Sequence, residues 1–145
     1  MKYKSVSEFK KSITTADIFV SNKIHKIHPI VEKISKNLSD IDLIKFIRIK
    51  PDMILASSEV TEGRAKIPIT KPDHPTAVGL SLLIDFAYNN VQFYEINSPI
   101  KGYGRKMVDA VFKSLPKNWY GVVIMDWSRG FWEKMQKSHK NLEIM

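Results

Sequence analysis

The sequence predicts an α+β fold, in which a central mixed, mostly antiparallel sheet is flanked by helices and preceded by a helical N-terminal third. Two observations favour this fold. Apolar residues recur at helical intervals through residues 1–50 and again through 102–115. Between these segments, residues 80–87 and 91–96 are short runs of the residue types that strands prefer. The length of 145 residues fits one domain over 1–145.

The N-terminal third predicts three helices, over residues 5–13, 29–38 and 41–47. Ser5 and Glu8 have the spacing of a capping box, which opens the first helix. Pro29 suits the first turn of the second helix, because its fixed φ is already helical. Either Ser39 or Asp40 can cap the short third helix.

The middle of the chain predicts strands over residues 53–56, 65–69, 80–87 and 91–96, with a surface loop over 71–75. Pro68 confines the second strand to a sheet edge, because proline cannot donate a ladder hydrogen bond. Asn89 and Asn90 lie between the last two strands, and asparagine tolerates the positive φ that tight turns require. These two strands are therefore expected to form a hairpin.

The last third predicts a helix over residues 102–115, a buried strand over 119–127, a helix over 131–138 and an edge strand over 142–145. Met107, Val108 and Val111 form an apolar stripe on the first of these helices, and Pro116 ends it. The strand is an apolar, β-branched run, as is typical of strands buried on both faces.

Charge is distributed unevenly, with a net charge of +8 from 23 basic and 15 acidic side chains. Residues 1–50 and 99–140 are basic, whereas residues 51–98 hold 3 basic and 6 acidic side chains. Such a surface suits nucleic acid or a polyanionic small molecule. A lysine-rich surface that only contacts water is the alternative.

Several classes of protein do not fit the sequence. The absence of cysteine excludes disulfides, thiolate metal sites and cysteine nucleophiles. His25 and His28 alone do not make a zinc site, so no metal is expected. The longest apolar stretch, 119–125, is too short to span a bilayer, and the N-terminus does not resemble a secretory signal. The expected location is the cytoplasm.

The segment with the clearest chemistry is a glycine turn between the strand at 91–96 and the helix at 102–115. Gly102 and Gly104 lack side chains, so a phosphate can approach the backbone amides at the start of the helix. Lys101, Arg105 and Lys106 add positive charge around it. A tight turn with no ligand is the alternative, because the spacing matches neither a P-loop nor a dinucleotide-binding fingerprint.

Residues 99–104, Pro-Ile-Lys-Gly-Tyr-Gly, resemble the Gln/Arg-x-x-Gly-x-Gly/Ala signature of the GNAT superfamily, the acetyl-CoA-dependent N-acetyltransferases. The order of expected elements over residues 79–145 is also similar to the second half of that family. Three positions depart from the pattern: Pro99 replaces Gln or Arg, the aromatic pair Phe131-Trp132 lacks a tyrosine, and Gln136-Lys137 replaces Gly-Phe.

The resemblance implies an α/β/α-type GNAT-like fold and acetyl-CoA as co-substrate. The pantetheine arm is expected to lie between two splayed parallel strands, at 91–97 and 119–127. The residues expected to bind acetyl-CoA are Ile96, Asn97, Ile100, Lys101, Gly102, Tyr103, Gly104, Arg105 and Lys106.

Catalysis in such an enzyme needs a general base for the substrate ammonium and a proton donor for the CoA thiolate. Glu95 and Asp126 are the expected carboxylates, and Asp85 on the hairpin partner is a further one. Ser128 or Tyr94 is the expected donor, with water as the alternative for either role.

The expected function is therefore direct transfer of an acetyl group from acetyl-CoA to an amine in a ternary complex. The acceptor can be a small amine, a protein amine or an aminoacyl-tRNA, and the sequence does not choose between them. The alternative is a non-enzymatic GNAT-like module that binds nucleic acid or a protein through its basic surface. A homodimer is compatible with both, and no membrane partner is expected.

Overall fold

The computed structural model describes residues 3–124 and 130–145. In these residues helices combine with a seven-stranded mixed sheet and a small two-stranded one, so the α+β prediction is confirmed. The helices are α1 (Val6–Ser12), α2 (Pro29–Ser39), α3 (Tyr103–Ser114) and α4 (Phe131–Ser138). The large sheet contains β2 (Asp17–Val20), β4 (Phe46–Lys50), β5 (Met53–Ser57), β6 (Gly79–Asp85), β7 (Asn90–Asn97), β8 (Tyr120–Val123) and β9 (Leu142–Ile144). The small antiparallel sheet contains β1 (Lys4–Ser5) and β3 (Lys26–Ile27).

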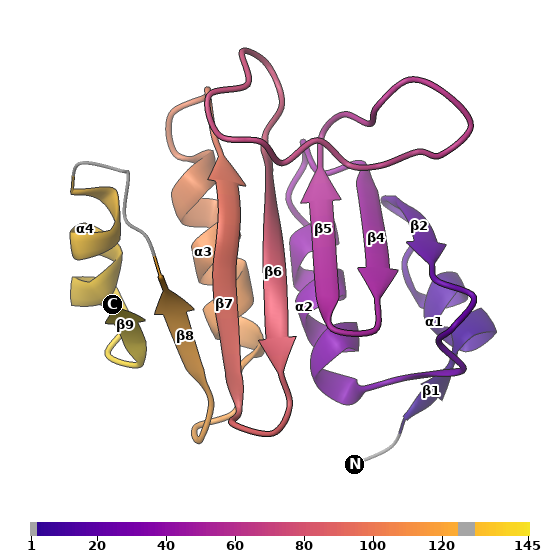
Figure 1. Cartoon of the computed structure of the whole chain (residues 1–145), viewed down its shortest axis with the longest axis horizontal. Helices are drawn as coiled ribbons and strands as arrows, with labels where there is room; N and C mark the ends of the chain where they lie inside the picture. The colour runs from indigo at the N-terminus through magenta and orange to yellow at the C-terminus, as the bar shows by residue number, and fades with distance from the viewer. Residues whose placement is uncertain (1–2, 125–129) are drawn as a thin grey trace.

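The strand order of the large sheet is β2-β4-β5-β6-β7-β8-β9 (Figure 1). The central strands β4 to β7 pair antiparallel, whereas the pairs β2–β4, β7–β8 and β8–β9 are parallel. The sheet is mixed as predicted, and the three antiparallel pairs are longer than the three parallel ones. A helix lies between the strands of each parallel pair, because α2, α3 and α4 carry the chain back to the end of the sheet from which the next paired strand starts.

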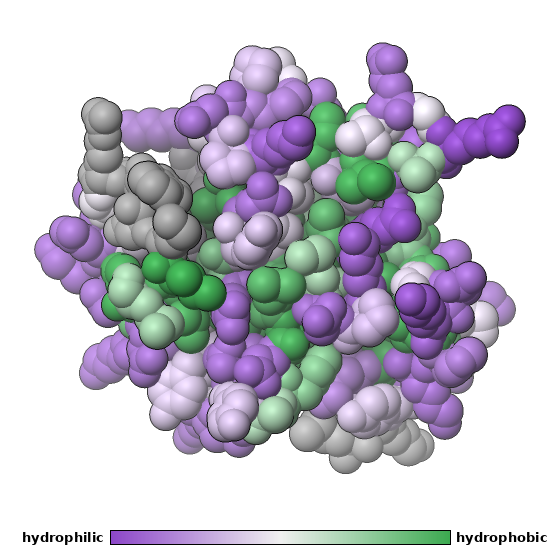
Figure 2. All heavy atoms as spheres, viewed as in Figure 1, coloured by the Kyte–Doolittle hydropathy of each residue, from purple (hydrophilic) through white to green (hydrophobic). Residues whose placement is uncertain are grey.

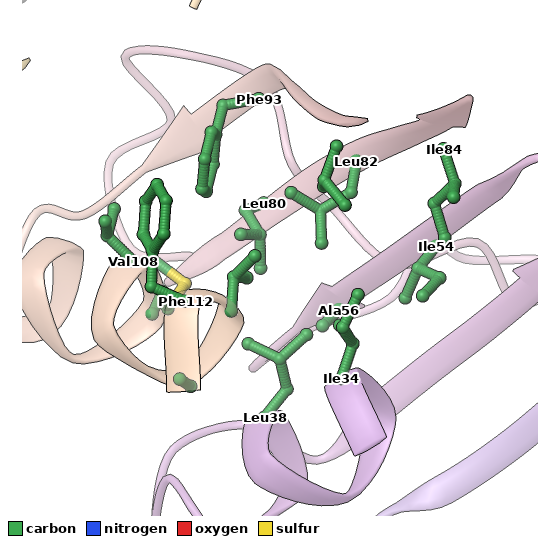
Figure 3. Close-up of a cluster of buried hydrophobic side chains, with 14 of the residues drawn as sticks. Ile34, Leu38, Ile54, Ala56, Leu80, Leu82, Ile84, Phe93, Val108 and Phe112 are labelled. Atoms are coloured by element: carbon green, nitrogen blue, oxygen red, sulfur yellow. The ribbon is translucent and has the colours of Figure 1, made fainter. Parts of the chain in front are cut away.

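The helices share one core on one face of the sheet. Ile34 and Leu38 of α2, and Val108 and Phe112 of α3, lie against the same face of β5, β6 and β7 (Figure 3). Phe9 of α1 and Trp132 of α4 belong to the same cluster of buried side chains. The α/β/α-type layering implied by the resemblance is therefore wrong for the described residues, which form two layers. The opposite face of the sheet is turned to the viewer in Figures 1 and 2 and presents both apolar and polar residues.

The β6–β7 hairpin forms as predicted. Asn89 adopts a φ of 53° in its turn, the left-handed conformation that asparagine tolerates. The register shifts between Ser81 and Leu82, because Ser81 pairs with Glu95 while Leu82 pairs with Phe93. This β-bulge leaves one extra residue, Tyr94, on β7.

The four helices predicted at 5–13, 29–38, 102–115 and 131–138 are confirmed. The Ser5 side chain caps α1 by accepting the Glu8 amide at 3.2 Å, as the capping-box spacing predicted. The strand at 53–56 and the edge strand at the C-terminus are also confirmed, as β5 and β9. Of the predicted strand at 119–127, the described part forms β8, which ends at Val123.

Two predictions in the first seventy residues were wrong. Where a helix was predicted at 41–47, the structure has a turn followed by β4. The short strands β1, β2 and β3 also lie within residues 1–50, so this part of the chain is not wholly helical. Ile47 and Ile49 are buried while Arg48 and Lys50 alternate with them, which is the period of a strand. Residues 65–69 form no strand, and only an isolated bridge joins Val60 to Pro68.

Candidate functional site

The glycine turn joins the end of β7 to the start of α3 (Figure 1). Gly102 is the N-cap of α3 and adopts a φ of 91°, a left-handed conformation that other residues rarely adopt. No side chain caps this helix start. The first amides of a helix have no intrahelical acceptor, so this end of α3 presents N–H donors and the positive end of the helix dipole.

The strands β7 and β8 run parallel beside this turn but are paired only over part of their length. Asn90, Val91 and Gln92 of β7 lie opposite Tyr120, Gly121 and Val122 of β8. The pairing ends at Gln92 and Val122, whereas β7 continues to Asn97 and β8 to Val123. The two strands predicted to lie side by side and parallel are therefore neighbours next to the glycine turn, and the gap expected beyond their pairing stays a prediction.

The second glycine, Gly104, has a packing role. It is buried in the first turn of α3, and a Cβ there would lie 3.1 Å from the Phe131 ring of α4. Its small size therefore lets α4 approach α3 closely. A phosphate is not needed to explain why this position is glycine.

The three predicted cationic residues are placed differently. Lys101 is exposed in the turn itself. The Lys106 Nζ atom lies 4.4 Å from the centre of the Tyr103 ring, a cation–π contact within the first turn of α3. Arg105 points away, because its guanidinium donates to Ser138 Oγ at 3.1 Å and lies 3.6 Å from Asp109 Oδ2. Arg105 thus ties α3 to the end of α4.

Tyr103 anchors the turn to a distant part of the chain. Its Oη lies 2.8 Å and 2.9 Å from the two carboxylate oxygens of Asp42, so the hydroxyl donates to this carboxylate. This hydrogen bond, with burial and the negative charge of Asp42 as smaller causes, raises the pKa of Tyr103. Sequence reasoning missed Asp42, since nothing local to 41–47 links it to the turn.

Glu95 is the predicted carboxylate that the structure describes in most detail. Its Oε1 accepts hydrogen bonds from Thr70 Oγ1 at 3.0 Å and Ser81 Oγ at 3.3 Å. Both hydroxyls are nearly inaccessible to solvent, whereas Glu95 is half-buried. Ser81 lies between two leucines that face the helices, so it and Glu95 lie on the opposite face of the sheet. Sequence reasoning missed both hydroxyl residues.

The remaining predicted acetyl-CoA residues on β7 and in the turn differ in accessibility. Ile96 packs against the core, and Ile100 is exposed. Asn97 is buried, and its Nδ2 donates to the carbonyl oxygens of His74 at 2.9 Å and Ala77 at 2.7 Å. Asn97 therefore holds the loop before β6 against the end of β7.

The other catalytic candidates are less informative. Asp126 and Ser128 lie outside the described residues. Asp85 is at the far end of β6, where its Oδ1 accepts the amides of Ala87 and Tyr88 at 3.0 Å each, so it serves the hairpin turn. Tyr94, the residue of the bulge, is 62% exposed and precedes Glu95 directly.

Two kinds of feature are absent from residues 3–124 and 130–145. These residues contain no cluster of three or more histidine or carboxylate side chains arranged to hold a metal ion. None of their helices has both the length and the apolar character needed to cross a membrane.

Comparisons of this chain with protein-family models, with curated proteins and with solved structures found no significant match.

Proposed function

We propose that this protein is an N-acetyltransferase that moves an acetyl group from acetyl-CoA to an amine. The observation that carries the proposal is the parallel pairing of β7 and β8 beside the uncapped helix start at the glycine turn. We expect these strands to part beyond Gln92 and Val122. A strand edge without a partner offers backbone donors and acceptors, which suit the amides of a pantetheine arm. Acetyl-CoA would supply the acyl group in activated form, as a thioester.

The start of α3 supports binding of the CoA phosphates. Its amides are not capped by a side chain, and Lys101 and Lys106 are exposed near them. Gly102 leaves the approach open, because nothing lies within 4 Å of the position a Cβ would take. Arg105 is not expected to contact the CoA phosphates, because its guanidinium donates a hydrogen bond to Ser138.

The position of Glu95 supports its role as general base. It lies on the face of the sheet opposite α3, so an acceptor and the CoA phosphates can approach the expected gap between β7 and β8 from opposite sides. Donors from Thr70 and Ser81 hold one carboxylate oxygen and thereby orient the group.

The proposed reaction begins when Glu95 takes a proton from the acceptor ammonium. The nitrogen lone pair then forms the new C–N bond at the thioester carbonyl, the C–S bond breaks, and its electron pair leaves with sulfur. The nitrogen loses its second proton to solvent water, and the thiolate gains one from Tyr94, which solvent then reprotonates, or directly from water.

Two substitutions of Gly102 test the phosphate site. Asparagine and aspartate have nearly the same shape, both tolerate positive φ, and both cap helices well. Aspartate alone adds a negative charge where the phosphate would lie. We expect Gly102→Asp to bind acetyl-CoA at least tenfold more weakly than Gly102→Asn in isothermal titration, or about 1.4 kcal/mol.

The outcomes of this titration separate the possibilities. Equal affinities for the two variants would remove the phosphates from the glycine turn. No binding of acetyl-CoA to the wild-type protein at tens of micromolar would end the proposal. Tight binding without transfer to any of a panel of amines would favour a non-enzymatic module.

A further inference from the structure

A cavity lies at the end of the sheet opposite the glycine turn. Its volume is about 530 Å³, within the usual range for small-molecule sites. The β3 strand, the start of α2, the β4–β5 hairpin and Phe86 of the β6–β7 turn surround it. Ile27, Val31 and Ile49 supply a buried apolar base.

The walls of this cavity are positively charged. Lys23, Lys26 and Lys50 line it and are exposed, and no described residue on its walls is acidic. Two carboxylates on the surrounding elements have other partners: Glu32 lies 2.8 Å from Lys4 Nζ, and Asp85 accepts the amides of its own turn. Asp52, which follows Pro51 in the chain, is exposed and does not line the cavity. The cavity therefore attracts anions.

Aromatic rings are the second feature of this cavity. The His28 ring lies between Tyr3 and Phe86, with centroid distances of 5.0 Å and 4.8 Å. Phe86 in turn meets Trp119 edge-on at 6.2 Å. Tyr3 is 53% exposed and Phe86 is 38% exposed, so both offer ring surface to a ligand.

The His28 ring is held in place by the backbone. Its Nδ1 accepts the amide of Ile30 at 3.0 Å, which caps α2. The neutral ring then carries its proton on Nε2. Burial lowers the pKa of His28, so the ring keeps this neutral form near pH 7.

We propose that this cavity binds a nucleoside phosphate, with the base stacked on Phe86 or Tyr3 and the phosphate held by Lys23, Lys26 and Lys50. Exposed aromatic rings beside lysines suit a ligand that carries both a flat aromatic ring and an anionic group. Inorganic phosphate and heparin are anions without such a ring. Base stacking on aromatic side chains with cations along the backbone is how proteins bind single strands. The ligand is therefore a free nucleotide or an unpaired nucleotide of a nucleic acid strand.

Two probes distinguish a free nucleotide from an unpaired nucleotide of a strand. A fluorescein-labelled 12-mer of uridylate reports strand binding by anisotropy, and AMP reports free nucleotide by isothermal titration. Saturation by the 12-mer with no binding of AMP at millimolar concentration assigns the site to a strand. The reverse assigns it to a free nucleotide. No binding of either probe at low salt would overturn the proposal.

A charge-matched pair of variants tests the lysines. In the site variant, Lys23, Lys26 and Lys50 become Gln. In the control, Lys134, Lys137 and Lys140, exposed at the opposite edge of the sheet, become Gln. We expect the site variant to lose at least tenfold in affinity for the bound probe and the control to lose less than threefold. For the 12-mer, the slope of log Kd against log salt should fall by about 2, at about 0.7 per phosphate. Equal losses in the two variants would overturn the site.

Phe86 tests whether the base is recognised. Phe86→Ala should weaken binding of the bound probe roughly tenfold without changing its salt dependence, since base stacking contributes about 1–3 kcal/mol. Phe86→Tyr keeps the ring and should restore binding, and thermal melting checks that both variants fold. Heparin, a polyanion without bases, should bind both variants alike. If Phe86→Ala and Tyr3→Ala both bind the nucleotide probe as the wild type does, no base is recognised here and the proposal is overturned.

The site is separate from the glycine turn, so the two proposals fail independently. Gly102→Asp should leave nucleotide affinity unchanged while weakening acetyl-CoA. If Gly102→Asp weakened the binding of both ligands equally, they would share one site and the proposal of a separate nucleotide site would be overturned.

Discussion

The two ends of the sheet differ in what forms a binding site. Where β7 meets α3, the backbone provides the main features: an uncapped helix start, a left-handed Gly102 and the parallel pairing of β7 with β8. At the opposite end, side chains provide the main features, namely Lys23, Lys26 and Lys50 together with the rings of His28 and Phe86.

This difference predicts how each end responds to substitution. A site made by the backbone is sensitive to what is added, because a new side chain fills the approach or blocks the close packing around it. A site made by side chains is sensitive to what is removed. Glu95 is the exception at the glycine-turn end, because there a side chain and its hydroxyl partners, not the backbone, form the feature. Glu95 should therefore be sensitive to removal.

The largest effect is expected for Glu95→Gln. Removing a general base typically costs at least about a hundredfold in rate, so acetyl transfer should fall by that factor while acetyl-CoA affinity stays unchanged. Glu143→Gln is the control, because Glu143 lies opposite Val122 on an exposed part of the sheet. Steady-state transfer to the best amine of a panel measures both. Unchanged turnover in Glu95→Gln would assign the base elsewhere.

A smaller effect is expected for Gly79→Ala, which tests close packing near Glu95. A Cβ at Gly79 would lie 2.6 Å from the Ile69 carbonyl oxygen and 2.7 Å from that of Ala56. Because both atoms are backbone, we expect a loss of about 1–3 kcal/mol in the free energy of unfolding, measured in urea. Gly63→Ala is the control: Gly63 has a φ of 113° but open space around it, so its cost should be about 1 kcal/mol, that of backbone strain alone. A loss at Gly79 no larger than that at Gly63 would show that the strands yield to the added methyl group.

The smallest effect is expected for His28→Asn, at the end formed by side chains. The pKa of His28 lies below its ordinary value of 6.5, so the native state disfavours the protonated ring. The contribution of His28 to the free energy of unfolding is therefore present above pH 6.5 and is lost as the pH falls. Asparagine keeps an acceptor for the Ile30 amide but does not titrate. We expect wild type to lose more stability than His28→Asn between pH 7.5 and pH 5, by no more than the roughly 1 kcal/mol that a helix cap contributes. Parallel pH profiles would contradict the capping role of His28.

Local signals predicted much of this fold correctly. The Ser5–Glu8 spacing, Pro29 and the apolar stripe of α3 each act within a few residues, so the helices they mark form as expected. The helix predicted at 41–47 failed for a physical reason. Ile41, Ile44 and Ile47 are all buried, as the helical spacing required, but a turn followed by a strand buries them equally well.

Neighbouring residues alone were enough to predict the glycine turn, the hairpin before it and the helix after it, because turn conformations and helix starts are local. Only the tertiary structure placed Thr70 against Glu95, 25 positions away, and Asp42 against Tyr103, 61 positions away. It also brought Tyr3, His28 and Phe86 together at one cavity. These contacts depend on strand order and register, which are decided by how the whole apolar surface is buried and not by any one segment.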